Sequence, residues 1–192
     1  MTENESYLSE QARGKGDVRE ALILAGIREI EEEGPDRFSL RRVATACGVS
    51  CAAPYKHFKS KDAFIAEIVA YIQEKWTLLE THILEVFAGK EECLTELCLA
   101  SVRFWIANPH FRAVRTMNRT GEGKFSVGEA AEEMLLSRAA QGGATQEQRD
   151  ELLYTVRSLV TGATLMLEDG TLANTPDTFR MLRRALKRVL PV

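Results

Sequence analysis

Hydrophobic residues recur at steps of three and four along most of the chain, a spacing that predicts amphipathic helices. Gly34-Pro35, Gly89, Asn108-Pro109 and Gly142-Gly143 interrupt the pattern and separate the helices. The expected helices cover residues 17–33, 60–89, 93–107, 126–141, 147–167 and 175–190, with a shorter one over 110–118 that a Gly-rich loop follows. The sequence therefore predicts an all-α protein.

Residues 38–61 contain two further helical patterns, both short, on either side of a glycine. Ser39 is placed to cap the first helix, Gly48 to adopt the left-handed conformation of a tight turn, and Ser50 to cap the second. Pro54 has no backbone N–H, so the second helix is expected to begin late or to bend there. This arrangement predicts a helix-turn-helix.

The same segment concentrates positive charge in a chain whose formal net charge is −3. It contains no Asp or Glu, and its cations are Arg41, Arg42, Lys56, Lys59 and Lys61. The first turn of a helix attracts anions, and neither short helix supplies an acidic residue of its own there. Both helix starts therefore stay available to a DNA phosphate. The alternative is a pair of ordinary serine caps on a solvated basic face.

Four pieces of the segment, in order and without gaps, carry a family resemblance. They are Leu40-Arg41-Arg42-Val43-Ala44, Gly48-Val49-Ser50, Tyr55-Lys56-His57-Phe58 and Lys61, which a long amphipathic helix follows. Over residues 16–76 the chain resembles the DNA-binding domain of the TetR family of transcriptional regulators. The resemblance implies a dimeric regulator, most often a repressor that a small-molecule effector releases from its operator.

The resemblance also assigns roles to single residues. It places Ser39, Ser50, Tyr55, His57 and Lys61 against phosphates, and Cys51, Ala52, Ala53 and Lys56 nearest to the base edges. Together with Arg41 and Arg42, these are the predicted DNA-binding residues, whereas Val43 and Phe58 are expected in the core. Because three of the base-facing residues are small, sequence preference is expected to depend on Lys56, on thymine methyl groups and on DNA shape.

We expect three regions along the chain. Residues 1–16 form a flexible arm, which either lays Arg13 and Lys15 into a minor groove or has no role. Residues 17–76 form the DNA-binding domain, with the helix-turn-helix at 39–58, and residues 77–192 form a helical effector-binding and dimerisation domain. The long helix over 60–89 is expected to belong to both domains and to transmit movement between them.

The last two helices show apolar stripes that fit either an intramolecular core or a dimer interface. By resemblance, they form a four-helix interface with a second copy of the chain. The predicted dimerisation residues are Leu152, Val156, Leu159, Val160, Ala163, Phe179, Leu182 and Leu186. A two-fold dimer would present two reading helices to a palindromic operator in double-stranded DNA.

Aromatic and methionine side chains in the second domain are candidates for an apolar effector pocket, with plain core as the alternative for each. They are Trp76, Phe104, Trp105, Met117, Phe125, Met134 and Met166. His82, Arg103, His110 and Glu168 are candidates for the polar contacts that orient a ligand.

Other functional classes find little support. The chain has no nucleotide-binding glycine motif, no GxSxG and no helical His/Glu metal pair, so neither an enzyme nor a cofactor is expected. No apolar run is long enough to span a membrane and the N-terminus is polar, so a cytoplasmic protein is expected. A helical interaction protein that does not bind DNA remains an alternative.

The four cysteines, Cys47, Cys51, Cys93 and Cys98, are expected to be reduced thiols. Cys47, Cys51 and His57 match no standard zinc module, so no metal site is expected. Cys51 would lie near the DNA, which leaves a thiol-responsive regulator as a second alternative.

Overall fold

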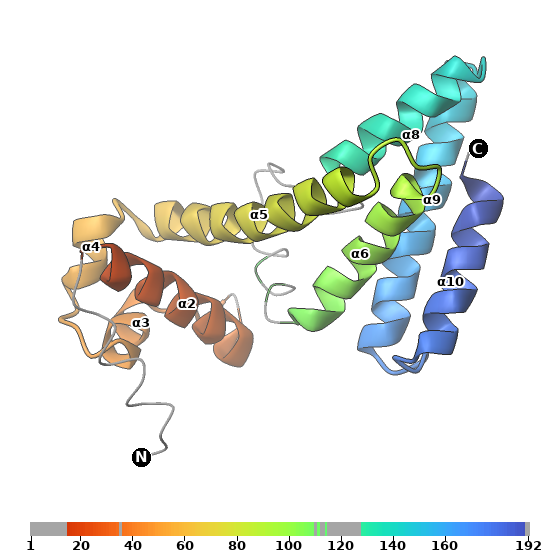
Figure 1. Ribbon diagram of the computed structural model, residues 1–192. Helices are drawn as coiled ribbons and strands as arrows, with labels where there is room; N and C mark the ends of the chain where they lie inside the picture. Colours follow the sequence, from red (N-terminus) through yellow and green to blue (C-terminus); the bar gives the residue numbers. More distant parts are fainter. Residues whose placement is uncertain (1–14, 35, 110, 112–113, 115–127, 191–192) are drawn as a thin grey trace. The chain divides into compact units, whose positions relative to one another are not determined.

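The computed structural model describes residues 15–34, 36–109, 111, 114 and 128–190, and every regular element among them is an α-helix (Figure 1). The helices are α2 (Lys15–Glu33), α3 (Leu40–Ala46), α4 (Ala53–His57), α5 (Lys61–Val86), α6 (Cys93–Ala107), α8 (Glu129–Gln141), α9 (Gln146–Glu168) and α10 (Pro176–Val189). This confirms the prediction of an all-α fold. The predicted arm and most of the predicted helix over 110–118 with its loop lie outside the described residues, although Phe111 and Val114 are helical.

The chain divides into two compact units. The first contains the described residues up to Gln73 with Phe111 and Val114, and the second contains residues 74–109 and 128–190. Helix α5 therefore contributes its first half to one unit and its second half to the other. The domain boundaries at residues 16 and 76 stay predictions.

The first unit packs α2, α3 and α4 with the start of α5 around one apolar core. Phe64 is at its centre, stacked on Phe38 at 5.8 Å between ring centroids and edge-on to Phe58 at 4.6 Å. A Cβ at Gly26 would lie 2.4 Å from the Phe64 ring, so the close packing of α2 on this ring requires glycine. As predicted, Val43 and Phe58 belong to this core.

In the second unit α6 and α9 are central. Eleven of the fifteen residues of α6 are buried, and this helix packs against α8, α9 and α10 (Figure 1). The core residues include Ile83, Leu94, Leu97, Cys98, Leu99, Val102, Leu135, Val156, Val160, Ala163, Leu182 and Leu186. Ion pairs add to the packing, since Arg157 on α9 binds Glu132 on α8 and Arg183 on α10 binds Glu96 on α6. None of the described helices has both the length and the apolar composition needed to cross a bilayer.

Candidate functional site

Backbone hydrogen bonds hold the turn between α3 and α4. The N–H groups of Gly48 and Val49 donate to the carbonyls of Thr45 and Ala44, both at 3.0 Å. Gly48 has a φ of +66°, the left-handed conformation that the sequence predicts. The chain therefore reverses direction at this glycine.

The two predicted serine caps have different outcomes. Ser39 occupies the N-cap position of α3, although its hydroxyl makes no capping hydrogen bond. Ser50 does not cap α4, because that helix begins at Ala53 with Ala52 as its N-cap residue, and the prediction was wrong. The physical reason is Pro54, which can occupy only the first turn of a helix, where a backbone N–H has no intrahelical partner. The late start of α4 agrees with the effect predicted for this proline.

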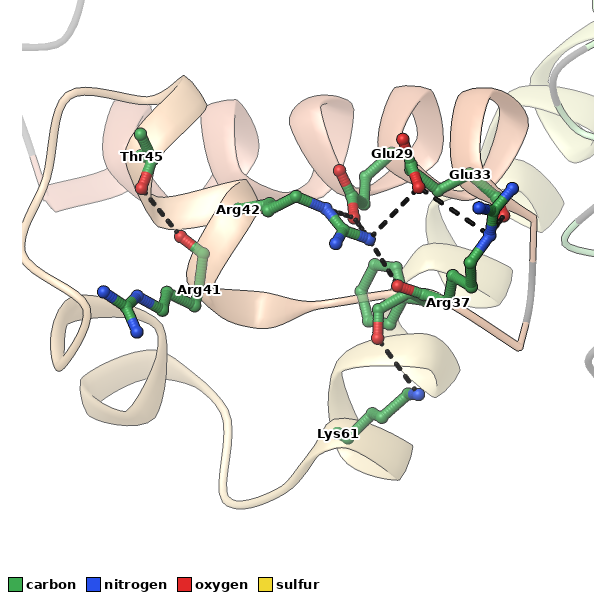
Figure 2. Close-up of polar contacts among 8 residues, drawn as sticks. Glu29, Glu33, Arg37, Arg41, Arg42, Thr45 and Lys61 are labelled. Carbon is green, nitrogen blue, oxygen red and sulfur yellow. Dashed lines mark hydrogen bonds and ion pairs between the residues drawn. The ribbon is translucent and has the colours of Figure 1, made fainter.

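Arg42 is held by residues of the same unit (Figure 2). Its guanidinium lies 2.6 Å from the Glu29 carboxylate and 3.7 Å from that of Glu33, both on α2, and it also donates to the Arg37 carbonyl. The hydrogen bond with Glu29 raises the pKa of Arg42. This geometry makes Arg42 a link between α2 and α3, and the predicted contact of Arg42 with DNA stays a prediction.

Arg41 points away from this network (Figure 2). Its side chain is exposed, and it makes no ion pair with any residue that the structure describes. Lys56 and Lys59 are also exposed, and Tyr55 on α4 is 62% exposed although it is a large aromatic residue. The surface of α3, α4 and the residues after α4 thus presents cations and a phenol that form no ion pair with the residues described by the structure.

The remaining predicted contact residues differ in exposure. Cys51 and Ala52 are exposed, whereas Ala53 and His57 are half-buried. The Lys61 ammonium donates to the Phe38 carbonyl at 3.2 Å and lies 5.3 Å from the Phe38 ring centroid. Since an ammonium group has three donors, this bond leaves two of them for another partner.

The two thiols of the first unit, Cys47 and Cys51, differ in exposure. Cys47 is half-buried and its Sγ donates to the Ala21 carbonyl at 3.4 Å, and burial raises the pKa of this thiol. Cys51 is exposed. No three His, Cys, Asp or Glu residues in the described part of the chain are grouped as metal ligands.

The predicted effector-pocket residues are only partly brought together. Trp76, Phe104 and Trp105 form an aromatic cluster with edge-to-face contacts, each at 5.4 Å between ring centroids. Met134 packs against the core of the second unit, whereas Met166 is on the exposed side of α9. Met117, Phe125 and His110 lie outside the described residues. Among the polar candidates, His82 is exposed, Glu168 is half-buried and Arg103 lies over the Phe179 ring at 4.5 Å.

The structure places the eight predicted dimerisation residues inside the subunit or at the edge of its core. Val156, Val160, Ala163, Leu182 and Leu186 are buried in the core of the second unit, and Leu152, Leu159 and Phe179 pack against it. Other apolar side chains of α9 and α10 are exposed, namely Tyr154 at 73%, Leu165 at 44%, Met166 at 38% and Met181 at 42%. The hydrophobic periodicity identifies apolar stripes on these helices, but it does not show which stripe faces the core.

Glu80 is a buried residue that the sequence analysis missed. It is on α5, one turn after Trp76, and only 8% of it is exposed. Burial raises its pKa, against the opposing effect of the backbone N–H groups of Ala130 and Ala131, which bind the carboxylate, and of the nearby Trp76 indole. The signal was present in the sequence, because this acid interrupts the apolar stripe between Trp76 and Ile83.

Comparisons with known proteins agree with this geometry. Residues 22–68, which include α3, the turn and α4, match the model of the bacterial regulatory proteins of the tetR family. A comparison with curated proteins found no match.

Three solved structures share the fold. A protein of unknown function from Rhodococcus sp. RHA1 has a TM-score of 0.71 at 22% identity, covering 95% of this chain and 100% of its own. A TetR family transcription regulator from Marinobacter aquaeolei has a TM-score of 0.62 at 15% identity, with 90% and 95% covered. A TetR variant from Acinetobacter baumannii AYE in complex with minocycline has a TM-score of 0.54 at 19% identity, with 92% and 93% covered.

The family match covers the helix-turn-helix that the motifs predicted, and the shared fold extends over most of the chain. The TetR family consists of DNA-binding regulators, not of enzymes. Residues 22–68 therefore carry the DNA-binding helix-turn-helix domain of the TetR family of transcriptional regulators.

Proposed function

We propose that this regulator acts as a homodimer that represses transcription from a palindromic operator and is released by a small-molecule effector. The observation that carries the proposal is the exposed, acid-free surface of α3, the turn and α4 within the family's DNA-binding domain. This surface favours DNA binding over the alternative of a helical interaction protein.

The phosphate contacts are assigned to polar groups that keep hydrogen-bonding capacity beyond their contacts with the described residues. Arg41, Lys59 and Tyr55 are exposed, and Lys61 keeps free donors beside its bond to Phe38. Ser39 and Ser50 supply hydroxyls that cap neither helix, and the half-buried His57 lies at the end of α4. Arg42 contributes indirectly, by holding α3 against α2.

Base recognition is assigned to Lys56 and to the small residues Cys51, Ala52 and Ala53 before and at the start of α4. A lysine donates to guanine acceptors in the major groove, and small side chains allow close contact with thymine methyl groups. A surface with so few long polar side chains leaves much of the sequence preference to DNA shape.

The dimer is supported by the exposed apolar side chains on α9 and α10. Tyr154, Leu165, Met166 and Met181 are apolar side chains that one subunit leaves in solvent. Gly162 is on the same helix as three of them, and nothing would lie within 4 Å of a Cβ added there. A glycine that the subunit's own packing does not require would allow a second helix to approach closely.

Release by an effector is supported by the shared fold with the minocycline complex and by the aromatic cluster around Phe104. An effector weakens DNA binding only to the extent that it prefers a conformation with poor DNA affinity. The expected outcome is therefore a shift in population, with an apparent operator affinity that falls as effector is added.

A mobility-shift titration with the DNA upstream of the protein's own reading frame, at two salt concentrations, tests the proposal. We expect a sequence-selective complex that weakens steeply with salt. Tyr55→Ala should weaken binding to all sequences, whereas Lys56→Ala should change the sequence preference by about 1–3 kcal/mol at one position. Lys90→Ala, which removes an exposed lysine outside this surface, is the matched control.

Two results would contradict the proposal. The first is a protein that is monomeric and indifferent to every duplex at low salt. The second is that Lys56→Ala keeps the DNA-sequence preference of the wild type, which would contradict the assignment of base recognition alone.

The exposure of Cys51 favours a second candidate, in which oxidation or alkylation of this thiol regulates DNA binding. Iodoacetamide treatment should then abolish operator binding in the wild type but not in Cys51→Ser. Loss of binding in both proteins would exclude Cys51 as the responsive thiol.

A further inference from the structure

Helix α4 depends on its surroundings for its position. It is five residues long, and its N-cap residue, Ala52, has no side chain that could cap it. Pro54 is buried, whereas Tyr55 and Lys56 are exposed. A helix this short is not stable alone in water, so the contacts at its two ends decide how it lies. The direction of Lys56, to which base recognition is assigned, depends on the same contacts.

Phe58, directly after α4, anchors the C-terminal end of this helix. It is the C-cap residue, and its N–H donates to the Pro54 carbonyl at 2.8 Å. Its side chain is only 3% exposed and meets the Phe64 ring of α5 edge-on at 4.6 Å between ring centroids. A shift of the Phe58 ring would therefore move the end of α4.

Arg19 on α2 contacts the same ring. The central carbon of its guanidinium lies 5.6 Å from the Phe58 ring centroid, within the range of a cation–π contact. The guanidinium also forms an ion pair with Glu67 on α5. Arg19, Phe58 and Glu67, which we call the Phe58 cluster, thus connect α2 and α5 to the end of α4.

The ion pair of the Phe58 cluster is important for its geometry more than for its strength. The side chains of Arg19 and Glu67 are 44% and 42% exposed, and a pair with that much solvent around it adds little to overall stability. An arginine without its carboxylate would sample many rotamers. The bond to Glu67 therefore keeps the guanidinium over the Phe58 ring.

We propose that Arg19 and Glu67 are positioning residues for DNA recognition, which hold the end of α4 through Phe58 and so set the direction of Lys56. The inference rests on the proposed function for the role of Lys56, whereas the effect on α4 itself does not depend on DNA. Neither Arg19 nor Glu67 needs to touch DNA for this effect.

Glu67→Gln tests the inference by the sign of its effect. Removing an acidic residue from a DNA-binding protein reduces its repulsion of phosphate, so charge alone would leave DNA affinity unchanged or raise it. If Glu67 positions α4, the variant should instead bind the operator about two- to fivefold more weakly. Glu20→Gln removes an exposed carboxylate from α2 and is the matched control, which should not weaken binding.

Arg19→Gln should weaken operator binding to a similar extent, and its salt dependence separates positioning from a phosphate contact. A lost phosphate contact would reduce the salt dependence by about one counterion, whereas the loss of a positioning residue leaves it unchanged. In the double variant Arg19→Gln/Glu67→Gln, the loss should equal that of either single change, because both residues act through one contact.

Amide hydrogen exchange of the full-length protein tests the Phe58 cluster without DNA. The Phe58 N–H should exchange about two- to fivefold faster in Glu67→Gln and in Arg19→Gln, because its hydrogen bond closes the end of α4. The Val43 N–H, which donates to the Ser39 carbonyl at 3.1 Å, should keep its wild-type rate in both variants. Equal acceleration at both amides would mean a general loss of stability and would contradict a positioning role.

Two further results overturn the inference, namely operator binding by Glu67→Gln that is as tight as that of the wild type, or an unchanged Phe58 exchange rate in both variants. Failure of the proposed function gives different results. Faster Phe58 exchange in a protein that forms no DNA complex counts against the proposed function alone. A Lys56→Ala variant with the wild-type sequence preference counts against the assignment of base recognition, and the exchange rates still report on α4.

Discussion

Arg41 and Arg42 are neighbours in the sequence, but the fold uses them differently. On a helix, consecutive side chains point about 100° apart, so only one of the two can face α2. Arg42 does so and binds Glu29, while Arg41 is exposed (Figure 2). A basic pair that looks uniform in the sequence thus contains one structural residue and one cation that forms no ion pair with the part of the chain that the structure describes.

We expect Arg41→Ala and Arg42→Ala to have different effects, the first on DNA binding and the second on stability. Arg41→Ala should weaken binding to all DNA sequences and reduce the salt dependence by about one counterion, with little change in Tm. Arg42→Ala should lower Tm, because it leaves Glu29 without its partner on α3. Mobility shifts at several salt concentrations and thermal unfolding measure the two effects. If Arg42→Ala instead reduced the salt dependence of DNA binding by one counterion and left Tm unchanged, Arg42 would be a phosphate contact.

Glu80 gives a prediction for pH. Its pKa is raised above the ordinary value of 4.5, so the native state holds a proton that the unfolded state releases between that value and the native pKa. Stability must therefore fall as pH rises through this window, by at most about 1.4 kcal/mol per pH unit for one group. Glu80→Gln should remove this part of the pH dependence.

Urea unfolding of the wild type and of Glu80→Gln at several pH values measures the difference. The exposed Glu74→Gln is the control and should follow the wild-type curve. A difference that grows in the opposite direction, with Glu80 adding stability as pH rises, would mean that the carboxylate is better stabilised in the fold than in water.

Among the elements, most helices could be predicted, but the starts of α4 and α8 were misplaced, since α8 begins at Glu129 and not at the predicted residue 126. Helix α6 begins and ends where the hydrophobic pattern places it, because most of its residues are buried in the core. The cap of α4 was placed at Ser50 because serine is a good cap by itself, although the late start that Pro54 favours was also expected and is the one observed. Glu80 was missed for a related reason, since spacing identifies a buried face but not the polar group that tertiary packing satisfies there.

The N-terminus of α8 gives a prediction at this scale. Gly128 cannot cap the helix with a side chain, and the Glu80 carboxylate from α5 binds the first N–H groups instead. In Gly128→Ala, the Cβ would lie 2.5 Å from Glu80 and 2.8 Å from the Trp76 ring, at a backbone conformation that favours glycine. We expect this variant to lose stability and to separate α8 from α5.

Gly143→Ala is the matched control, because this glycine also has a positive φ but has open space around it. It should cost about 1–2 kcal/mol for backbone conformation alone. Gly128→Ala should cost about 1–3 kcal/mol more, since it adds an overpacked contact. Equal losses in denaturant unfolding would mean that the packing around Glu80 adapts without cost.

For the whole molecule, the question is which apolar surface remains after the chain has folded. The core takes the stripes of α9 and α10 that the sequence pattern emphasises, and leaves Tyr154, Leu165, Met166 and Met181 exposed. These residues could not be identified from periodicity, since two apolar stripes on one helix look alike until a neighbour covers one of them. The proposed dimer would bury this second face.

Leu165→Asp and Met181→Asp test that face. Each places a charge where the dimer would exclude water, so both should shift the protein toward monomer and weaken operator binding. Leu78→Asp introduces the same charge at a residue of α5 that is 61% exposed and should leave the subunit count unchanged. Sedimentation velocity over a range of concentrations gives the result. A dimer that survives both substitutions must use another surface.

The turn at Gly48 also limits how the gene can change. Its φ of +66° is one that L-residues rarely adopt, with Asn, Asp and His the more tolerated exceptions. A single base change converts a glycine codon to one for alanine, valine, serine, cysteine, arginine, tryptophan, aspartate or glutamate. Only aspartate in that set is among the tolerated residues, and it would bring a negative charge to a surface assigned to phosphate. Every amino-acid replacement that a single base change can make at this position is therefore expected to cost either folding stability or DNA affinity.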